Sequence, residues 1–231
     1  MGNDEIAIVF GASGGIGGAL LRAVETSGRH AAVLGFGRAS DPSLDLLDEA
    51  TIERMARHLA SLGGPVTLAI DATGFLHGNG FAPEKSWRQI DPVHMARAFA
   101  INAIGPALLM KHVLPLLPRD RRAVFATLSA RVGSIGDNRT GGWYAYRASK
   151  AALNQIVRTA AIELARSRPQ AVCVALHPGT VRTALSEPFA KAGLNVRDPD
   201  EAAADLLRVL NGVGPEQSGL LLDHAGAVVP W

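Results

Sequence analysis

Residues 6–17 read IAIVFGASGGIG, and this stretch decides the fold. Ile6–Phe10 is a run of five apolar residues typical of a buried strand, and a helix is predicted over 15–27. A strand that turns sharply into a helix leaves N–H groups free at the helix N-terminus, and glycine allows a pyrophosphate to approach them. The turn therefore predicts a dinucleotide site, with a tight turn that binds nothing as the alternative. The residues expected to form the site are Gly11, Ser13, Gly14, Gly15, Ile16 and Gly17.

Apolar runs and helical patterns alternate along the rest of the chain. This alternation predicts an α/β protein with a doubly wound parallel sheet, covered by helices on both faces, in one domain over residues 1–231. Pro106 is expected to kink the helix that contains it. The stretch 183–198 lacks periodicity and is predicted to be a substrate lid. Further strands are predicted at 31–36, 66–70, 123–128, 172–176 and 220–222, and helices at 49–62, 92–114, 143–167 and from 198 onward.

Composition excludes several classes of protein. The formal net charge of the 231 residues is +2, which gives no basis for nucleic-acid binding. Cys173 is the single cysteine, lies in an apolar run and reads as a core thiol, so no internal disulfide is expected. No apolar run approaches the ~18 residues of a membrane span, and no secretory signal is visible. We expect a cytoplasmic protein without a membrane segment or a metal site, because no His, Asp or Glu cluster has ligand spacing.

The end of the second predicted strand bears on the choice of dinucleotide. An acidic residue there would bind the ribose 2′-hydroxyl of NAD, whereas an arginine accommodates the 2′-phosphate of NADP. The sequence reads Leu34-Gly-Phe-Gly-Arg38, without an acid. Arg38 therefore favours NADP(H) over NAD(H), unless it is an ordinary exposed arginine.

A tyrosine and a lysine are spaced for proton transfer. Tyr146 and Lys150 lie four residues apart in a predicted helix, so their side chains share one face. An ammonium about 4 Å from a phenol is expected to lower the phenol's pKa toward the range that general acid–base catalysis requires. Tyr144 falls on another face. The alternative is a tyrosine packed on a lysine stem, but the glycine turn in the same chain favours catalysis.

With these motifs the sequence resembles the short-chain dehydrogenase/reductase family over nearly its whole length. The run 141–147 and the ending Pro230-Trp231 are similar to the branch of sniffer-type carbonyl reductases and bacterial C-factor proteins. The resemblance implies a single Rossmann-type domain, with Tyr146 and Lys150 as the catalytic pair and Asn102 anchoring a proton-relay water. It also implies cofactor contacts from Tyr146, Lys150, Asp45, Gly74, Pro178, Gly179, Val181 and Thr183.

Two positions depart from the family pattern. Asp71-Ala-Thr-Gly74 stands where the family has Asn-Asn-Ala-Gly. Ser129-Ala130 stands where the family has a Ser-Ser pair whose second member is catalytic. Ser129 or Ser134 is then the candidate to replace the missing hydroxyl, although successive residues of a strand point to opposite sides.

The resemblance implies hydride transfer between NADP(H) and a small carbonyl or alcohol substrate, with Tyr146 as general acid or base. Relatives are often homodimers or homotetramers, so either assembly is expected. The alternative function is that of a nucleotide-binding signalling or regulatory protein of the C-factor type with little turnover. His177, which precedes Pro178, is a further candidate to reach the cleft.

Overall fold

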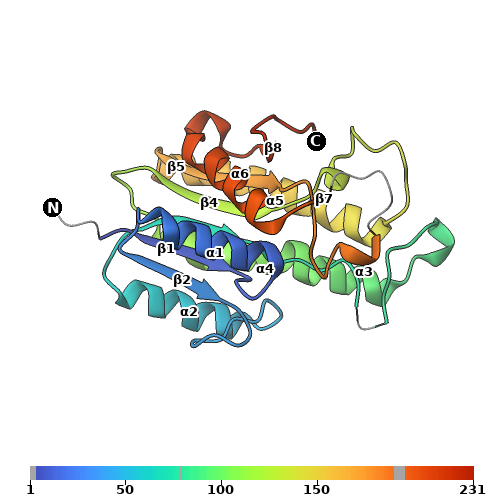
Figure 1. Ribbon diagram of the computed structural model, residues 1–231, viewed down its shortest axis with the longest axis horizontal. Coiled ribbons are helices and arrows are strands. Elements are labelled where there is room, and N and C mark those ends of the chain that lie inside the picture. The colour runs from blue at the N-terminus through green and yellow to red at the C-terminus, as the bar shows by residue number, and fades with distance from the viewer. Residues whose placement is uncertain (1–3, 79, 190–195) are drawn as a thin grey trace.

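A six-stranded parallel sheet forms the centre of the protein (Figure 1). The computed structural model describes residues 4–78, 80–189 and 196–231. Every neighbouring pair of strands is parallel, in the order β2-β1-β3-β4-β5-β8. The strands are β1 (Ile6–Phe10), β2 (Ala32–Phe36), β3 (Val66–Asp71), β4 (Ala123–Leu128), β5 (Ala171–His177) and β8 (Leu221–Asp223).

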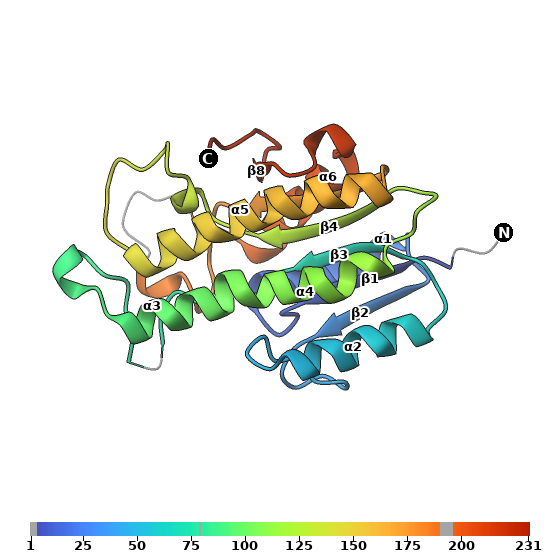
Figure 2. The same cartoon turned by 180° about the vertical axis from the view of Figure 1, so that it is seen from behind.

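Helices cover both faces of the sheet, as predicted. Helices α1 (Gly15–Ser27) and α6 (Pro199–Gly212) pack together on the face seen in Figure 1. The opposite face, turned to the viewer in Figure 2, carries α2 (Glu49–Ser61), α4 (Gly105–Val113) and α5 (Tyr144–Ser167). The observed bounds lie within about two residues of the predicted ones, because the apolar periodicity stops where the packing stops.

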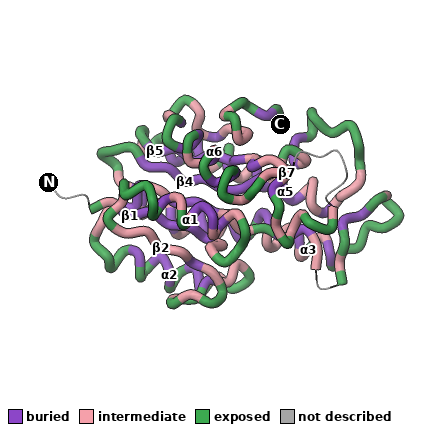
Figure 3. Tube along the Cα trace, viewed as in Figure 1, coloured by how far each residue is buried: buried purple, intermediate pink, exposed green. Residues whose placement is uncertain are grey.

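Alternate residues of each strand supply two apolar cores. In β1, Ile6, Ile8 and Phe10 face the core under α2, α4 and α5, whereas Ala7 and Val9 face the core under α1 and α6. The tube in Figure 3 is accordingly mostly purple along the inner strands, whereas the edge strand β2 is mostly pink. Cys173 is fully buried in the first core, and burial raises the pKa of its thiol to about 12, as befits a core thiol.

The order of the strands reverses next to β1. The chain passes from β1 to β2 on one side and returns to β3 on the other. In open parallel sheets this reversal leaves a crevice at the carboxyl ends of the strands, where ligands bind. The glycine turn after β1 and the segment after β3 therefore meet at one edge of the sheet.

The long helix before β4 changes its hydrogen-bond register just before Pro106. α3 (Pro92–Phe99) runs into a π-helical stretch, Ala100–Ile104, and then into α4. In a π-helix each N–H pairs five residues back, and this change of register immediately precedes Pro106, whose nitrogen cannot donate to the carbonyl of Asn102. The irregularity thus falls on Asn102 rather than at the proline.

The helical stretch Pro92–Leu116 is long and apolar enough, by length and composition alone, to cross a membrane. Polar residues interrupt this stretch, so it contains no continuous apolar run of the length of a membrane span. In the structure the stretch packs beside α5 and buries His94 and Asn102.

The predicted lid lies only partly within the described residues. After β5 the chain forms β6 (Thr180–Val181), which pairs with β7 (Val196–Arg197), and a short 3₁₀ helix at Glu187–Phe189. Residues 190–195 of the predicted lid lie outside the described part. The two-residue strands were not predicted, since they are too short to show a period.

Candidate active site

The turn after β1 has room only for glycine at two positions. A Cβ at Gly17 would lie 2.1 Å from the carbonyl oxygen of Gly11, and one at Gly15 would lie 2.7 Å from Cγ2 of Thr183. Gly11 itself has a φ of 75°, a conformation that favours glycine. The N-cap of α1 is Gly14, which carries no capping side chain. The first N–H groups of α1 therefore face an open space that can hold a phosphate.

A second segment covers this turn from above. Pro178, Gly179, Val181 and Thr183 follow β5, and the methyl group of Thr183 lies over Gly15. The N–H of Thr183 donates to Oγ of Ser186 at 3.1 Å. A cavity of about 580 Å³ lies between the two segments and extends to α5. The predicted cofactor residues that line it are Gly14, Gly15, Ile16, Gly74, Pro178, Gly179, Val181, Thr183, Tyr146 and Lys150.

Other predicted cofactor residues lie outside this cavity. Gly11, Ser13 and Gly17 shape the turn without lining it. Arg38 is exposed in the turn after β2, one residue from Gly37, where a Cβ would lie 3.5 Å from Oγ of Ser13. Its position beside the glycine turn suits the adenosine half of a dinucleotide.

Asp45 is placed differently from the other predicted contacts. Its carboxylate accepts a hydrogen bond from the N–H of Leu47 at 3.0 Å, and its own N–H donates to Oγ1 of Thr51. Asp45 does not line the cavity. In this structure it orders the loop that leads into α2.

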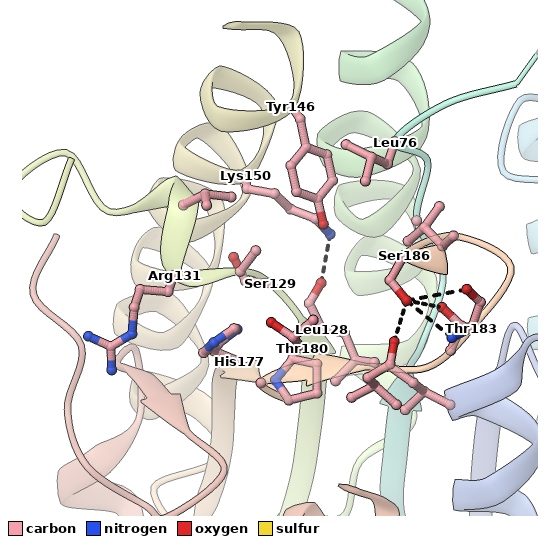
Figure 4. Close-up of a pocket in the computed structure, with 18 of the residues that line it drawn as sticks. Leu76, Leu128, Ser129, Arg131, Tyr146, Lys150, His177, Thr180, Thr183 and Ser186 are labelled. Atoms are coloured by element: carbon pink, nitrogen blue, oxygen red, sulfur yellow. Dashed lines mark hydrogen bonds between the residues drawn. The ribbon is translucent and has the colours of Figure 1, made fainter. Parts of the chain in front are cut away.

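Tyr146 and Lys150 lie on one turn of α5 and both line the cavity (Figure 4). The ammonium nitrogen of Lys150 is 5.9 Å from the centroid of the Tyr146 ring and donates to the carbonyl of Leu128 at 2.7 Å. A Cβ at Gly74 would lie 3.8 Å from this nitrogen. The segment after β3 therefore passes close to the lysine.

The expected lowering of the tyrosine pKa is not found. Part of Tyr146 is exposed to solvent, but burial of its phenol raises the pKa to about 12. Burial also lowers the pKa of Lys150 to about 8, a change that the nearby Asp71 opposes. Desolvation is the cause that acts on the phenol, while the ammonium of Lys150 is bound to the carbonyl of Leu128. The phenol is thus held in its protonated form.

Asp71 is a fully buried carboxylate at a position where the family pattern has asparagine. Its Oδ1 accepts from the N–H and the hydroxyl of Thr73 at 3.0 and 2.5 Å, and its Oδ2 accepts from the hydroxyl of Thr127 at 2.7 Å. Burial raises the pKa of Asp71, while these hydrogen bonds and the charge of Lys150 oppose the rise. The network ties the end of β3 to β4 beneath the cavity.

Asn102 joins the segment after β3 to the helix that carries Tyr146. Its Oδ1 accepts from the N–H of Phe75 at 2.7 Å, and its Nδ2 donates to the carbonyl of Phe75 at 2.8 Å. The same amide donates to Oγ of Ser149 at 3.0 Å. Asn102 is fully buried, and its hydrogen bonds hold the backbone of Phe75 against Ser149, the residue before Lys150.

Neither candidate serine offers its hydroxyl to the cavity. Ser129 borders the cavity, but its hydroxyl donates to Oδ1 of Asn154 at 2.6 Å. Ser134 does not line the cavity; its hydroxyl is buried and accepts from the N–H of Asp137 at 3.1 Å. The residue that faces the cavity where a catalytic serine was expected is Ala130. The hydroxyl of Ser134 closes a turn at Asp137, and the replacement of the missing hydroxyl by either serine stays a prediction.

Trp143 is a cavity residue that the sequence did not reveal. It has a φ of 55°, a conformation that is rare and strained for a bulky residue. Its ring packs edge-on against Tyr146, with centroids 6.2 Å apart, and against Phe189 at 5.3 Å. No local sequence signal predicts this conformation beyond the two glycines that precede it.

Glu84 could not be predicted from the sequence either, because it lies in a loop about 60 residues before the helix that it contacts. Its carboxylate accepts from the N–H of Ala145 at 3.2 Å, in the first turn of α5, and contacts Nδ1 of His94 at 3.2 Å. Both Glu84 and His94 are buried. A carboxylate at a helix N-terminus compensates free N–H groups and the helix dipole, so Glu84 caps the helix that begins just before Tyr146.

Comparison with known proteins identifies the family. Residues 11–210 match the family model described as "Enoyl-(Acyl carrier protein) reductase", which represents short-chain dehydrogenases. The chain belongs to the short-chain dehydrogenase/reductase family. The resemblance inferred from the sequence is confirmed, and with it the oxidoreductase class.

Two curated relatives illustrate the range of this family. The C-signal protein of Myxococcus xanthus is 42% identical over 143 residues, which are 62% of this chain and 81% of that protein. The 1-hydroxy-2-glutathionyl-2-methyl-3-butene dehydrogenase of Rhodococcus sp. (strain AD45) is 29% identical over 233 residues, covering 97% of this chain and 98% of that protein.

Solved structures share the whole fold. The carbonyl reductase Sniffer of D. melanogaster superposes with a TM-score of 0.85 at 20% identity, and coverage is 100% of both chains. A short-chain dehydrogenase/reductase from Burkholderia multivorans, solved with bound NADP, superposes with a TM-score of 0.80 at 26% identity and the same coverage. These likenesses confirm the predicted single-domain Rossmann-type architecture.

Proposed function

We propose that the protein is an NADP(H)-dependent reductase of small carbonyl compounds, in which Tyr146 exchanges a proton with the substrate oxygen. The observation that carries this proposal is the placement of Tyr146 and Lys150 in a cavity that continues to the glycine turn at Gly14 and Gly15. A dinucleotide laid along this cavity would have its phosphates at the N-terminus of α1 and its other end beside the phenol.

Four residues of the site have a task in this proposal. When bound, NADPH supplies the hydride. Tyr146, whose raised pKa keeps the phenol protonated, donates a proton to the developing alkoxide. The ammonium of Lys150 stabilises the phenolate that results, and the buried carboxylate of Asp71 favours that ammonium form. Asn102 holds the segment carrying Phe75 against α5.

Two observations support NADP(H) rather than NAD(H). Arg38 stands after β2 where an acidic residue would select NAD, and its guanidinium can pair with a 2′-phosphate. The Burkholderia structure at 26% identity has NADP bound. The glycine turn and the roof around Thr183 fit a dinucleotide, since side chains are absent where its phosphates would pass.

The chain offers a matched pair of variants to test the proposal. Oxidation of NADPH is measured with a panel of aldehydes, ketones and quinones for the wild type, Tyr146→Phe and Tyr144→Phe. We expect Tyr146→Phe to lower kcat by at least about 100-fold, because the general acid is lost. Tyr144 does not line the cavity, so Tyr144→Phe is expected to keep wild-type activity. Unchanged turnover by Tyr146→Phe would rule out the mechanism.

A signalling or regulatory role with little turnover is the second candidate. It is favoured by the 42% identity to C-signal and by Ala130, which leaves the cavity without the expected hydroxyl. The same assay separates the two functions. Tight binding of NADPH without turnover of any carbonyl in the panel would favour the second.

A further inference from the structure

The cavity has two chemically different ends. Figure 4 shows Thr183 and Ser186 at one end, Arg131 and His177 at the other, and the phenol of Tyr146 between them. The end at Thr183 lies over Gly15 and the free N–H groups of α1. If that end takes the phosphates, the end at Arg131 is left for the part of the substrate beyond its carbonyl.

The charges along the cavity are strongly unbalanced. Among the described residues, its lining contains one acid, Asp137, and four basic residues, Arg131, Arg139, Arg147 and Lys150. Arg131 and Arg139 come from the segment between β4 and α5, and Arg147, in the first turn of α5, is bonded to the carbonyls of Val132 and Gly142 in that segment. They are therefore placed to meet the substrate rather than the phosphates of a dinucleotide.

Within the described part of the chain, no carboxylate forms an ion pair with Arg139 or Arg147, whereas Arg131 has two such partners. Arg131 is paired with Asp137 and Asp223 at 3.3 and 3.4 Å. Arg147 is fixed by the carbonyls of Gly142 and Val132 and by the hydroxyl of Thr140, all of them neutral acceptors. Arg139 is exposed and forms no ion pair with any residue in the described part of the chain. Arg139 is thus an exposed cation, whereas the guanidinium of Arg147 is held in place by its hydrogen bonds.

An apolar wall of the cavity lies beside Tyr146 and toward Ser186 (Figure 4). The rings of Trp143 and Phe189 pack edge to face, and Leu76 and Leu185 complete this wall. Aromatic and aliphatic side chains that line a cavity with cationic residues suit a ligand with an apolar body and an acidic group.

We propose that the natural substrate is a carbonyl compound with an apolar body and a carboxylate or other anionic group, which Arg139 binds. Arg147 contributes its fixed charge, and the wall around Trp143 holds the apolar body. This inference rests on the proposed function, since it names the substrate class of the same site. Arg139 is therefore a specificity residue, because it contacts the substrate away from the reacting carbonyl.

Two aldehydes with the same ring and substitution pattern, one anionic and one neutral, test the inference. The value of kcat/KM with NADPH is measured for 4-carboxybenzaldehyde and for its neutral methyl ester, methyl 4-formylbenzoate. The wild type is expected to prefer the acid. In Arg139→Gln the ratio of the two kcat/KM values is expected to fall about tenfold, mainly through KM for the acid, because one charge-assisted contact is lost. Arg139→Lys is expected to keep part of the preference.

Arg119→Gln is the control for a general loss of positive charge. Arg119 precedes β4 at the opposite edge of the sheet and does not line the cavity, so the ratio should stay at the wild-type value. An unchanged ratio in Arg139→Gln, or a wild type that prefers the ester, overturns the inference and leaves carbonyl reduction intact. Failure of the wild type to reduce any carbonyl overturns the proposed function and this inference with it.

Discussion

His177 is expected to make the stability of the protein depend on pH. Its ring lines the cavity, Nδ1 is buried without a hydrogen-bond partner among the described residues, and Arg131 and His224 lie close enough to disfavour a cation. Burial, aided by these charges, lowers the pKa of His177 from 6.5 to about 4. Below pH 6.5 the unfolded chain therefore binds a proton that the folded chain does not.

The sign and size of the effect follow from this difference. The contribution of neutral His177 to stability is fully present above pH 6.5 and is lost as the pH falls toward 4. The whole difference corresponds to about 3 kcal/mol, of which about 2 kcal/mol is lost by about pH 5. His177→Gln removes the titrating group and should flatten this part of the stability curve.

Urea unfolding followed by tryptophan fluorescence measures the effect at neutral pH and at about pH 5. The wild type should lose about 2 kcal/mol more between the two conditions than His177→Gln. His58→Gln, which replaces a histidine outside the cavity, should behave as the wild type. An equal loss in the wild type and in His177→Gln would show that this imidazole does not titrate as its surroundings imply.

Three further substitutions probe the turn, the helix cap and the cofactor choice. Gly17→Ala should abolish NADPH binding in a fluorescence titration, because its Cβ would lie 2.1 Å from the carbonyl oxygen of Gly11; wild-type affinity would contradict the structure. Glu84→Gln should lower the free energy of unfolding by about 1–3 kcal/mol, since the charged acceptor of the Ala145 N–H is lost, and an unchanged urea midpoint would argue against the cap. Arg38→Ala should reduce the preference for NADPH over NADH about tenfold in kcat/KM, and an unchanged preference would remove Arg38 from the phosphate site.

Most of the fold could be predicted from the sequence, because buried parallel strands and amphipathic helices leave distinct periods. The runs at Ile6–Phe10 and Ala123–Leu128 match their strands residue for residue. The π-helical stretch at Ala100–Ile104 could not be predicted from Pro106 alone. A helix can accommodate the missing N–H of a proline by a kink or by a change of hydrogen-bond register. The π-helical stretch packs against α5, and such tertiary contacts leave no signal in the local sequence.

The site could be predicted where it depends on positions within one element. Tyr146 and Lys150 share a helix face by spacing alone, and the cavity contains both. Contacts between segments that are far apart in the sequence left no such signal. The hydroxyl of Ser129 turns to Asn154, the strained Trp143 packs on Phe189, and Glu84 caps α5 from a distant loop, all of which depend on tertiary packing.

A crystal structure with NADP⁺ and a carbonyl substrate analogue tests the central claim most directly. We expect the pyrophosphate against the N–H groups of Gly15 and Ile16, and the hydroxyl of Tyr146 within hydrogen-bond reach, about 2.6–3.2 Å, of the analogue's oxygen. A nicotinamide bound away from Tyr146, or a phenol turned from the analogue, would contradict it.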